Sequence, residues 1–255
     1  TTVPGIGTNV RGDLGYYMDF NDRLRKQTAH AGANPGNIAT ISYLGYVAPK
    51  NSGVDIVQAA DIGYAERGAP KLARFEEGLR ASADARGHQF TNTLLGHSYG
   101  STTSGKSMPM MAPGTIDNFV MFGSPGSGVR NIDAYGLPEG HVYESSIPYG
   151  DAVQGLGPDE WYGTNPSKLE GVTHLSGDGA NPNKYWVHPP EYLYSSSEAA
   201  LADYSMHSFD NHMAYFEEGT RTSQDFANIV AGGQQTTDEE WAAIKEARTS
   251  DKTSH

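Results

Sequence analysis

The stretch Gly-His-Ser-Tyr-Gly at residues 96–100 constrains the fold of this chain more than any other short segment. It matches the pattern G-x-S-x-G, in which the serine, here Ser98, sits on a sharp turn between a strand and a helix. Glycines two residues to either side let neighbouring backbone approach without a Cβ clash. The apolar stretch Thr91–Leu95 precedes the motif and small residues follow it. This context favours the chemical motif over a Gly/Ser loop without chemistry.

Strand and helix patterns alternate along the chain, which indicates a mostly parallel sheet flanked by helices. The strands are apolar on both faces, as expected when helices cover both sides of the sheet. We therefore predict a three-layer α/β/α sandwich. The expected strands, in their order across the sheet, are Ile38–Leu44, Thr1–Val3, Thr91–Leu95, Asn118–Phe122 and Val142–Ile147.

Four further stretches have helical patterns. Asp13 can cap the first of them, Pro70 falls near the first turn of the second, and Thr237 with Glu240 forms a capping box for the last. A frayed tail is expected from Thr249 to His255. The expected helices run from Leu14 to about Gly32, over Ala69–Ser82, over Ser223–Ala231, and from the capping box through Arg248.

The chain is expected to form one catalytic domain over residues 1–233, followed by a C-terminal helix and tail over residues 234–255. Residues 154–204 are rich in Gly, Pro, Asn and aromatic side chains. Such a long irregular segment is typical of a lid or a pocket wall, although its aromatics could equally pack a small core of their own. The candidate substrate-binding residues are Tyr46, Trp161 and Trp186.

Charge and composition exclude several functions. The 30 acidic residues outnumber the 18 basic ones, giving a net charge of -12, whereas nucleic-acid binding needs a positive surface. No apolar run approaches the ~18 residues of a membrane span, and the absence of cysteine excludes disulfides and thiolate catalysis. No metal or dinucleotide motif is present, so no cofactor and no metal are expected. Abundant Gly, Tyr, Asn, Ser and Thr with little Lys favours a secreted over a cytoplasmic protein.

A serine hydroxyl needs a base to take its proton, and the base needs a carboxylate to orient it. With this motif the partners follow in the order Ser, then Asp or Glu, then His. Asp151 comes four residues after an expected strand and is the favoured acid, with Asp178 and Asp159 as alternatives. The position near the end of the domain selects residues 207–212 for the base, which leaves His207 and His212 open.

An oxyanion in the reaction needs two backbone N–H donors. The N–H of Tyr99 follows the serine and begins a helix, so it is the first expected donor. The second comes from the loop after an earlier strand, and only Pro-Gly-Ile-Gly-Thr at residues 4–8 fits. Ile6 is the first choice there and Gly7 the second. The alternative for this stretch is a plain turn.

Several strings together resemble a known family. They are Val-Pro-Gly-Ile-Gly-Thr, Tyr-Leu-Gly-Tyr-Val-Ala-Pro, Ala-Pro-Lys-Leu-Ala-Arg-Phe-Glu-Glu-Gly-Leu-Arg, Gly-His-Ser-Tyr-Gly-Ser and Phe-Gly-Ser-Pro-Gly. The chain resembles the actinobacterial α/β-hydrolase family of undefined function from about Val3 to Gly232. The resemblance implies Asp151 and His212 as partners of Ser98. It also implies hydrolysis of an ester, amide or thioester, without naming a substrate.

Two departures from the family stand out. The segment around Thr173–Tyr185 is longer and less regular, which puts the lid and pocket in question. The two edge strands that normally precede the strand at Thr1–Val3 are not found, so either the core is minimal or a preceding segment has been removed.

The expected function is a serine esterase or lipase-like carboxylic ester hydrolase that forms an acyl-enzyme on a small-molecule or lipid-like substrate. An acyltransferase and a peptidase or amidase remain alternatives, as does an inactive binding module with the same fold. Two weaker ideas are a nucleophile at Thr1, which needs antiparallel layers, and an adhesion tripeptide at residues 11–13.

Overall fold

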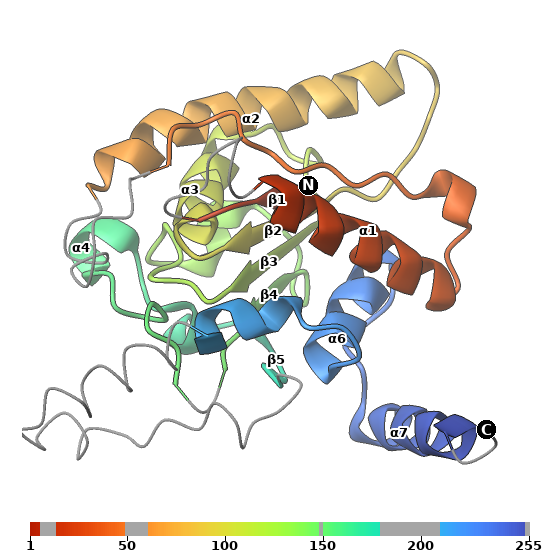
Figure 1. The fold of residues 1–255 in the computed structure, drawn as a ribbon. Coiled ribbons are helices and arrows are strands. Elements are labelled where there is room, and N and C mark those ends of the chain that lie inside the picture. Colours follow the sequence, from red (N-terminus) through yellow and green to blue (C-terminus); the bar gives the residue numbers. More distant parts are fainter. Residues whose placement is uncertain (6–13, 49–60, 148–149, 179–209, 253–255) are drawn as a thin grey trace, which may run out of the picture.

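A computed structural model describes residues 1–5, 14–48, 61–147, 150–178 and 210–252 of the chain. Its centre is a sheet whose five strands all pair in parallel and follow the chain order across the sheet (Figure 1). This sheet is the expected parallel type. The strands are β1 (Thr2–Val3), β2 (Thr93–His97), β3 (Asn118–Phe122), β4 (Val142–Ser145) and β5 (Thr173–Leu175).

Helices precede and follow these strands in the described parts of the chain. The α-helices are α1 (Leu14–His30), α2 (Gly63–Asp84), α3 (Tyr99–Ser107), α4 (Asp159–Tyr162), α6 (Arg221–Val230) and α7 (Asp238–Lys252). Short 3₁₀ helices lie in the connections between helices and strands: η1 (Pro35–Asn37), η2 (Met108–Met110), η3 (Ile132–Tyr135), η4 (Pro166–Lys168) and η5 (Ala214–Phe216).

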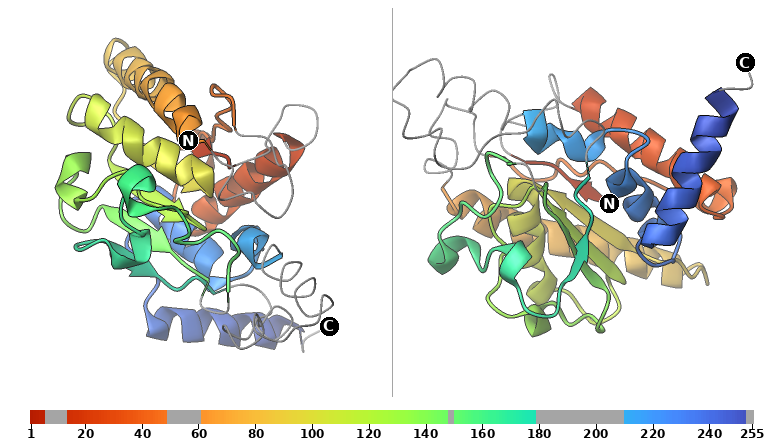
Figure 2. Two further views of the ribbon diagram at one scale, coloured as in Figure 1. Left: turned by 90° about the vertical axis from the view of Figure 1, so that its left-hand side faces the viewer. Right: turned by 90° about the horizontal axis from the view of Figure 1, so that it is seen from below.

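The helices form two layers, one on each face of the sheet (Figures 1 and 2). Successive side chains of a strand point to opposite faces. Phe119 and Met121 of β3 therefore pack with residues of α2 and α3. Val120 and Phe122 pack with residues of α1 and α6. The predicted three-layer α/β/α sandwich is thus the observed fold, and its two cores lie on the two faces of the sheet.

The expected strand Ile38–Leu44 is largely wrong. Only Ser42 forms a bridge, with Thr2, although the chain does lie at the predicted edge of the sheet, beyond β1. The Thr2 N–H donates to the Ile41 carbonyl at 2.8 Å, and the Tyr43 N–H donates to the Thr2 carbonyl at 2.9 Å. Because β1 has only two residues, it offers no further backbone groups to extend this pairing.

A strand inside the supposedly irregular segment was not predicted. β5 pairs with β4, with Glu144 opposite His174, and is an edge strand of the sheet. It has three residues, too few for a period-2 pattern to stand out in the sequence. Several strand boundaries also shift: β1 begins at Thr2 rather than Thr1, and β4 ends at Ser145 rather than Ile147. β2 covers Thr93–His97 rather than Thr91–Leu95.

Helix α2 begins six residues earlier than expected, so Pro70 lies inside it and not in its first turn. The early start follows from capping, because the first N–H groups of a helix need acceptors outside it. The side chain of Asp61 accepts from the Gly63 N–H at 2.8 Å. The buried hydroxyl of Tyr99 accepts from the Ala65 N–H at 2.9 Å.

The C-terminal part contains α6 at nearly the expected residues and α7 with its predicted cap. The Thr237 N–H donates to the Glu240 carboxylate at 2.8 Å, and the Glu240 N–H donates to the Thr237 hydroxyl at 3.2 Å. The helix continues to Lys252, beyond its expected end at Arg248. Asp13, the expected cap of α1, lies outside the described residues. None of the described helices combines the length and the apolar character that crossing a bilayer requires.

Candidate active site

Ser98 occupies a strained turn at the carboxyl end of β2. Its φ of 56° and ψ of -135° make it the one non-glycine residue with a positive φ in the described part of the chain. Such a conformation costs about 1–3 kcal/mol and persists only where the surroundings impose it. The turn is therefore the strand-to-helix bend that the G-x-S-x-G pattern predicts.

The two glycines of the motif are required by close backbone contacts. A Cβ at Gly96 would stand 2.5 Å from the Ser101 Cα, and one at Gly100 would stand 2.2 Å from the Val3 carbonyl oxygen. Real Cβ atoms do not approach backbone atoms so closely. The glycines thus let α3 fold back against β2 and let β1 lie beside the start of α3.

The backbone around Ser98 includes one expected oxyanion donor and lies beside Gly5, the residue that precedes the other in the sequence. Tyr99 is the first residue of α3, so its N–H has no acceptor within the helix. The loop after β1 lies against Ser98, because a Cβ at Gly5 would stand 2.8 Å from the Ser98 Oγ. Ile6 and Gly7, the candidates for the second donor, lie outside the described residues.

Asp151 and His212 meet in a buried pair. The Nδ1 of His212 lies 2.8 Å from Asp151 Oδ1, and the exposed fractions of the two side chains are 8% and 0%. Asp151 follows the end of β4, as predicted from the strand pattern, and His212 lies in a short helical stretch at residues 210–213. The structure therefore joins a strand-end carboxylate to a histidine 61 positions later in the chain.

The surroundings of Asp151 favour its ionised form. Burial alone would raise the pKa of this carboxyl, but the charge of His212 and several hydrogen bonds lower it below its ordinary value. The Val153 N–H donates to Asp151 at 2.8 Å, and the Tyr215 hydroxyl donates to the other carboxylate oxygen at 2.9 Å. A carboxylate held in this way can orient an imidazole and balance a positive charge on it.

The His212 ring lies beside the strand ends that carry Ser98. A Cβ at Gly123, the residue after β3, would stand 3.0 Å from the Nδ1 and the Cε1 of His212. The Ser98 N–H donates to the carbonyl of Phe122, the residue before this glycine, at 3.0 Å. The side chains of Ser98 and His212 are both described, and no hydrogen bond joins the Ser98 hydroxyl to the His212 imidazole. Bonds of this kind often tighten only in the complex with substrate.

The alternatives for acid and base have other positions. Asp159 begins α4, and Asp178 comes three residues after β5. His207, the alternative base, lies outside the described residues. His174 is paired with the buried carboxylate of Glu144 at 2.6 Å on β5 and β4.

The three candidate substrate-binding residues have different surroundings. Tyr46 is buried, and its hydroxyl donates to the Pro4 carbonyl in the loop beside Ser98. Trp161 is 61% exposed on α4. Trp186 lies outside the described residues. A substrate contact for each of them stays a prediction.

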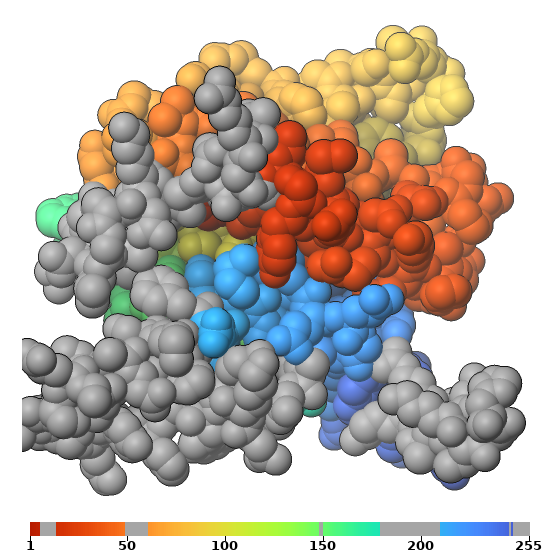
Figure 3. Space-filling model, viewed as in Figure 1, coloured from red at the N-terminus to blue at the C-terminus, as the bar shows by residue number. Residues whose placement is uncertain are grey.

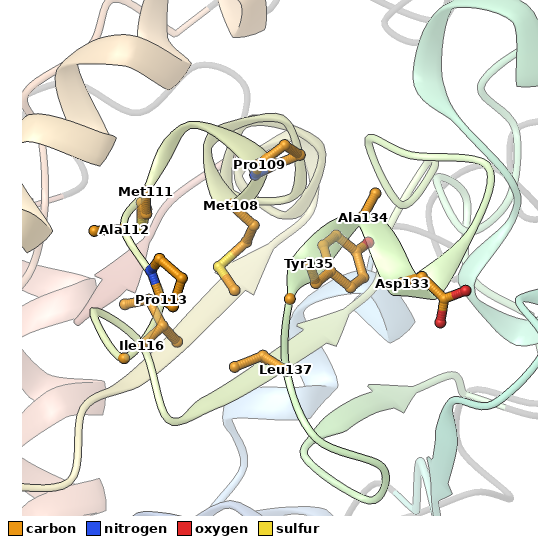
Figure 4. A pocket seen from close by; sticks show the side chains of 12 residues that line it. Met108, Pro109, Met111, Ala112, Pro113, Ile116, Asp133, Ala134, Tyr135 and Leu137 are labelled. Carbon is orange, nitrogen blue, oxygen red and sulfur yellow. The ribbon is translucent and has the colours of Figure 1, made fainter.

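Two cavities in the described part of the chain lie away from Ser98. One of about 170 Å³ opens at the far end of α3, between Met108 and Tyr135 (Figure 4). The other, of about 660 Å³, is lined by Thr1 and Thr93 at the amino edge of the sheet, opposite the edge of Ser98. Among the described residues, no three His, Asp or Glu side chains gather closely enough to hold a metal ion.

Helix α1 packs against the segment that carries His212. The two lie side by side on one face of the molecule (Figure 3). Arg23 of α1 donates to the Phe216 carbonyl at 3.4 Å, and Gln27 donates to the Ser223 hydroxyl at 3.4 Å. This packing fixes the position of the histidine segment relative to the sheet.

Sequence reasoning missed three residues that contact the candidate site: Tyr215, His97 and Tyr17. Tyr215 follows His212 by three positions, a spacing that places two side chains on one face of a helical turn. That spacing could have found it. His97 and Tyr17 meet across 80 positions of the chain, and no local pattern signals such a contact.

Comparison with known proteins gives one family and several relatives. A family described as alpha/beta hydrolase matches residues 1–158, which include Ser98 and Asp151. Uncharacterized proteins from Mycobacterium tuberculosis and Mycobacterium bovis are each 28% identical over 181 residues. The match covers 69% of this chain and spans about 65% of the length of those relatives.

Proposed function

The chain belongs to the alpha/beta hydrolase family, and we propose that it is a serine hydrolase that cleaves a carboxylic ester or a related acyl bond. The observation that carries the proposal is the buried pair of His212 and Asp151, joined at 2.8 Å, beside the strained turn at Ser98. A buried carboxylate, an imidazole and an activated serine are the three parts that acyl transfer to serine requires.

In the proposed mechanism, the Nδ1–H of His212 donates a hydrogen bond to the ionised Asp151, so the unprotonated Nε2 can accept a proton. Nε2 takes the proton of the Ser98 hydroxyl while Oγ attacks the carbonyl carbon of the substrate. The N–H groups of Tyr99 and Ile6 stabilise the oxyanion. His212 then protonates the leaving alcohol, which departs as the acyl-enzyme forms, and a water activated by the same imidazole releases the acid.

Labelling with a fluorophosphonate and hydrolysis of short p-nitrophenyl esters test this proposal. The full chain should react stoichiometrically at Ser98, and Ser98→Ala should abolish both labelling and hydrolysis. Loss of the nucleophile in such sites lowers kcat by about 10⁶-fold. Ser104→Ala is the matched control, because its hydroxyl is buried in the same helix without a partner, and it should behave as the wild type.

Two results would contradict the proposal. One is modification of Thr1 in place of Ser98. The other is equal inertness of the wild type and Ser98→Ala toward both the fluorophosphonate and esters of all acyl lengths, which would favour a binding module of the same fold.

A further inference from the structure

His97, the residue before Ser98, is buried between the candidate base and helix α1. It is 2% exposed, and its ring stacks on the His212 ring with centroids 4.6 Å apart. The rings of Phe122 and Phe216 also border it, at 5.1 and 4.6 Å. A histidine in this position contacts the candidate base directly.

Both nitrogens of His97 have hydrogen-bond partners that fix its tautomer. Nε2 lies 3.0 Å from the backbone carbonyl of His212, and a carbonyl only accepts, so Nε2 carries a proton. Burial and the neighbouring His212 lower the pKa of His97 well below its ordinary value. The ring is therefore neutral, and its Nδ1 accepts a hydrogen bond from the Tyr17 hydroxyl, with 3.0 Å between the two atoms.

The Tyr17 hydroxyl continues this chain of hydrogen bonds to the loop after β1. Its oxygen accepts from the Gly5 N–H at 3.3 Å. Gly5 borders the Ser98 hydroxyl and immediately precedes Ile6, the expected oxyanion donor. The hydrogen bonds thus run from the loop through Tyr17 and His97 to the backbone of His212.

We propose that His97 is a positioning residue that, together with Tyr17, holds the base segment and the loop at Gly5 in a fixed relation on either side of Ser98. This inference rests on the proposed hydrolase function. The base and the oxyanion donors act on the same transition state, so an error of about 1 Å between them is costly. Through their hydrogen bonds to the backbone of His212 and Gly5, His97 and Tyr17 act on the groups that carry out the reaction.

A packing role is the rival explanation, because aromatic rings surround His97. Phenylalanine would satisfy packing but would remove the hydrogen bonds that His97 makes with the His212 carbonyl and with the Tyr17 hydroxyl. The amide nitrogen of glutamine can replace Nε2 and still donate to the carbonyl. The amide oxygen does not then occupy the position of Nδ1, so Tyr17 loses its acceptor there. His97→Phe, His97→Gln and Tyr17→Phe therefore separate packing from hydrogen bonding.

The experiment measures kcat and KM for a p-nitrophenyl ester and the rate constant of fluorophosphonate labelling. We expect Tyr17→Phe and His97→Gln each to lower kcat by about tenfold, the effect of one lost hydrogen bond, with KM within about twofold. His97→Phe should lower kcat further. Because the same chain of bonds is broken, the double variant Tyr17→Phe/His97→Gln should fall less than the product of the single effects.

Tyr135→Phe is the matched control. Tyr135 is also a buried tyrosine whose hydroxyl donates a hydrogen bond, here to the Ser127 carbonyl at 2.6 Å. It lies by the cavity at the far end of α3 (Figure 4). Its kcat should equal that of the wild type. Circular dichroism and thermal unfolding establish that each variant is folded.

Wild-type kcat in folded Tyr17→Phe and His97→Gln would overturn this proposal while leaving the hydrolase function intact. So would multiplicative effects in the double variant, because independent packing defects multiply. Failure of the hydrolase function itself would show differently, as a wild type that does not react at Ser98 at all.

Discussion

The carboxylate of Asp151 connects protonation, folding and the proposed chemistry at the scale of a single residue. Its Oδ1 accepts from His212, Val153 and Gln154, and its Oδ2 accepts from Tyr215. The pKa of the Tyr215 hydroxyl is raised well above its ordinary value by burial and by the charge of Asp151. Tyr215 therefore stays protonated and remains a donor to the carboxylate.

Asp151→Asn should lower kcat for ester hydrolysis by about 10⁴-fold, because an amide cannot hold the His212 tautomer that leaves Nε2 unprotonated. Tyr215→Phe removes one of several hydrogen bonds to the carboxylate and should cost only about tenfold. Steady-state kinetics on both variants provide the measurement. An Asp151→Asn enzyme as fast as the wild type would remove this residue from the mechanism.

The same carboxylate predicts a dependence of stability on pH. The pKa of Asp151 is lowered in the folded chain relative to its ordinary value of 3.8, so its ionised form stabilises the fold at every pH above 3.8. This contribution is lost as the pH falls from 3.8 through the lower folded-state pKa, because the unfolded chain takes up the proton first. Denaturant unfolding should therefore show a wild-type advantage over Asp151→Asn that shrinks only below pH 3.8. An advantage unchanged at lower pH would contradict this assignment.

The residues of the candidate site differ in how far the sequence predicts them. Ser98 follows from a local motif, because its strained turn needs glycines at fixed positions. Asp151 follows from its place after a strand, and the structure brings it to His212. The choice between His207 and His212 required the family resemblance, because sequence position does not determine which imidazole faces a carboxylate. Contacts such as that of His97 with Tyr17 depend on how α1 packs and could not be predicted.

At the scale of elements, local signals predicted α1, β3 and α6 well, because each combines a clear apolar pattern with flanking turn residues. Ile38–Leu44 has β-branched and apolar residues but forms one bridge, since pairing depends on the length of the neighbouring strand. The early start of α2 depends on a cap from Tyr99, 34 positions away. Both errors arise where a distant partner overrides local propensity.

The turn between β2 and α3 gives a prediction at this scale. Gly96→Ala would place a Cβ 2.5 Å from the backbone of Ser101, and overpacking of this kind costs about 1–3 kcal/mol or more. The shift of α3 should also move Ser98 and lower the rate of fluorophosphonate labelling. Gly78→Ala is the matched control, because Gly78 is an exposed residue of α2 and nothing lies within 4 Å of its Cβ position. This substitution should stabilise the fold by about 0.5–1 kcal/mol. Chemical denaturation measures both, and equal stability of the two variants would contradict the steric argument.

At the scale of the whole molecule, the proposed division separates residues 1–233 from the C-terminal helix and tail. Hydrogen bonds hold the segment between α6 and α7 against α6. The Thr236 N–H donates to buried Asp225 at 2.7 Å, and Arg221 donates to the Thr236 carbonyl at 2.7 Å. An ion pair between α6 and α7 joins Arg221 to Asp238, whose side chain is 92% exposed, so it contributes little. Of the described side chains of α7, Trp241 is the buried one, at 9% exposure.

Removal of residues 238–255 should therefore leave the proposed active site intact while lowering stability. The shortened chain keeps the contacts of Thr236 but exposes the surface that Trp241 covers, and burying a large side chain contributes about 1.5–3 kcal/mol. Trp241→Ala in the full chain should reproduce most of this loss, because Trp241 is the buried side chain among those described in α7. Fluorophosphonate labelling of Ser98 at the wild-type rate, measured together with the free energy of unfolding, checks both statements. A shortened chain that folds but no longer labels would show that the C-terminal helix belongs to the catalytic unit and that the boundary at residue 233 is wrong.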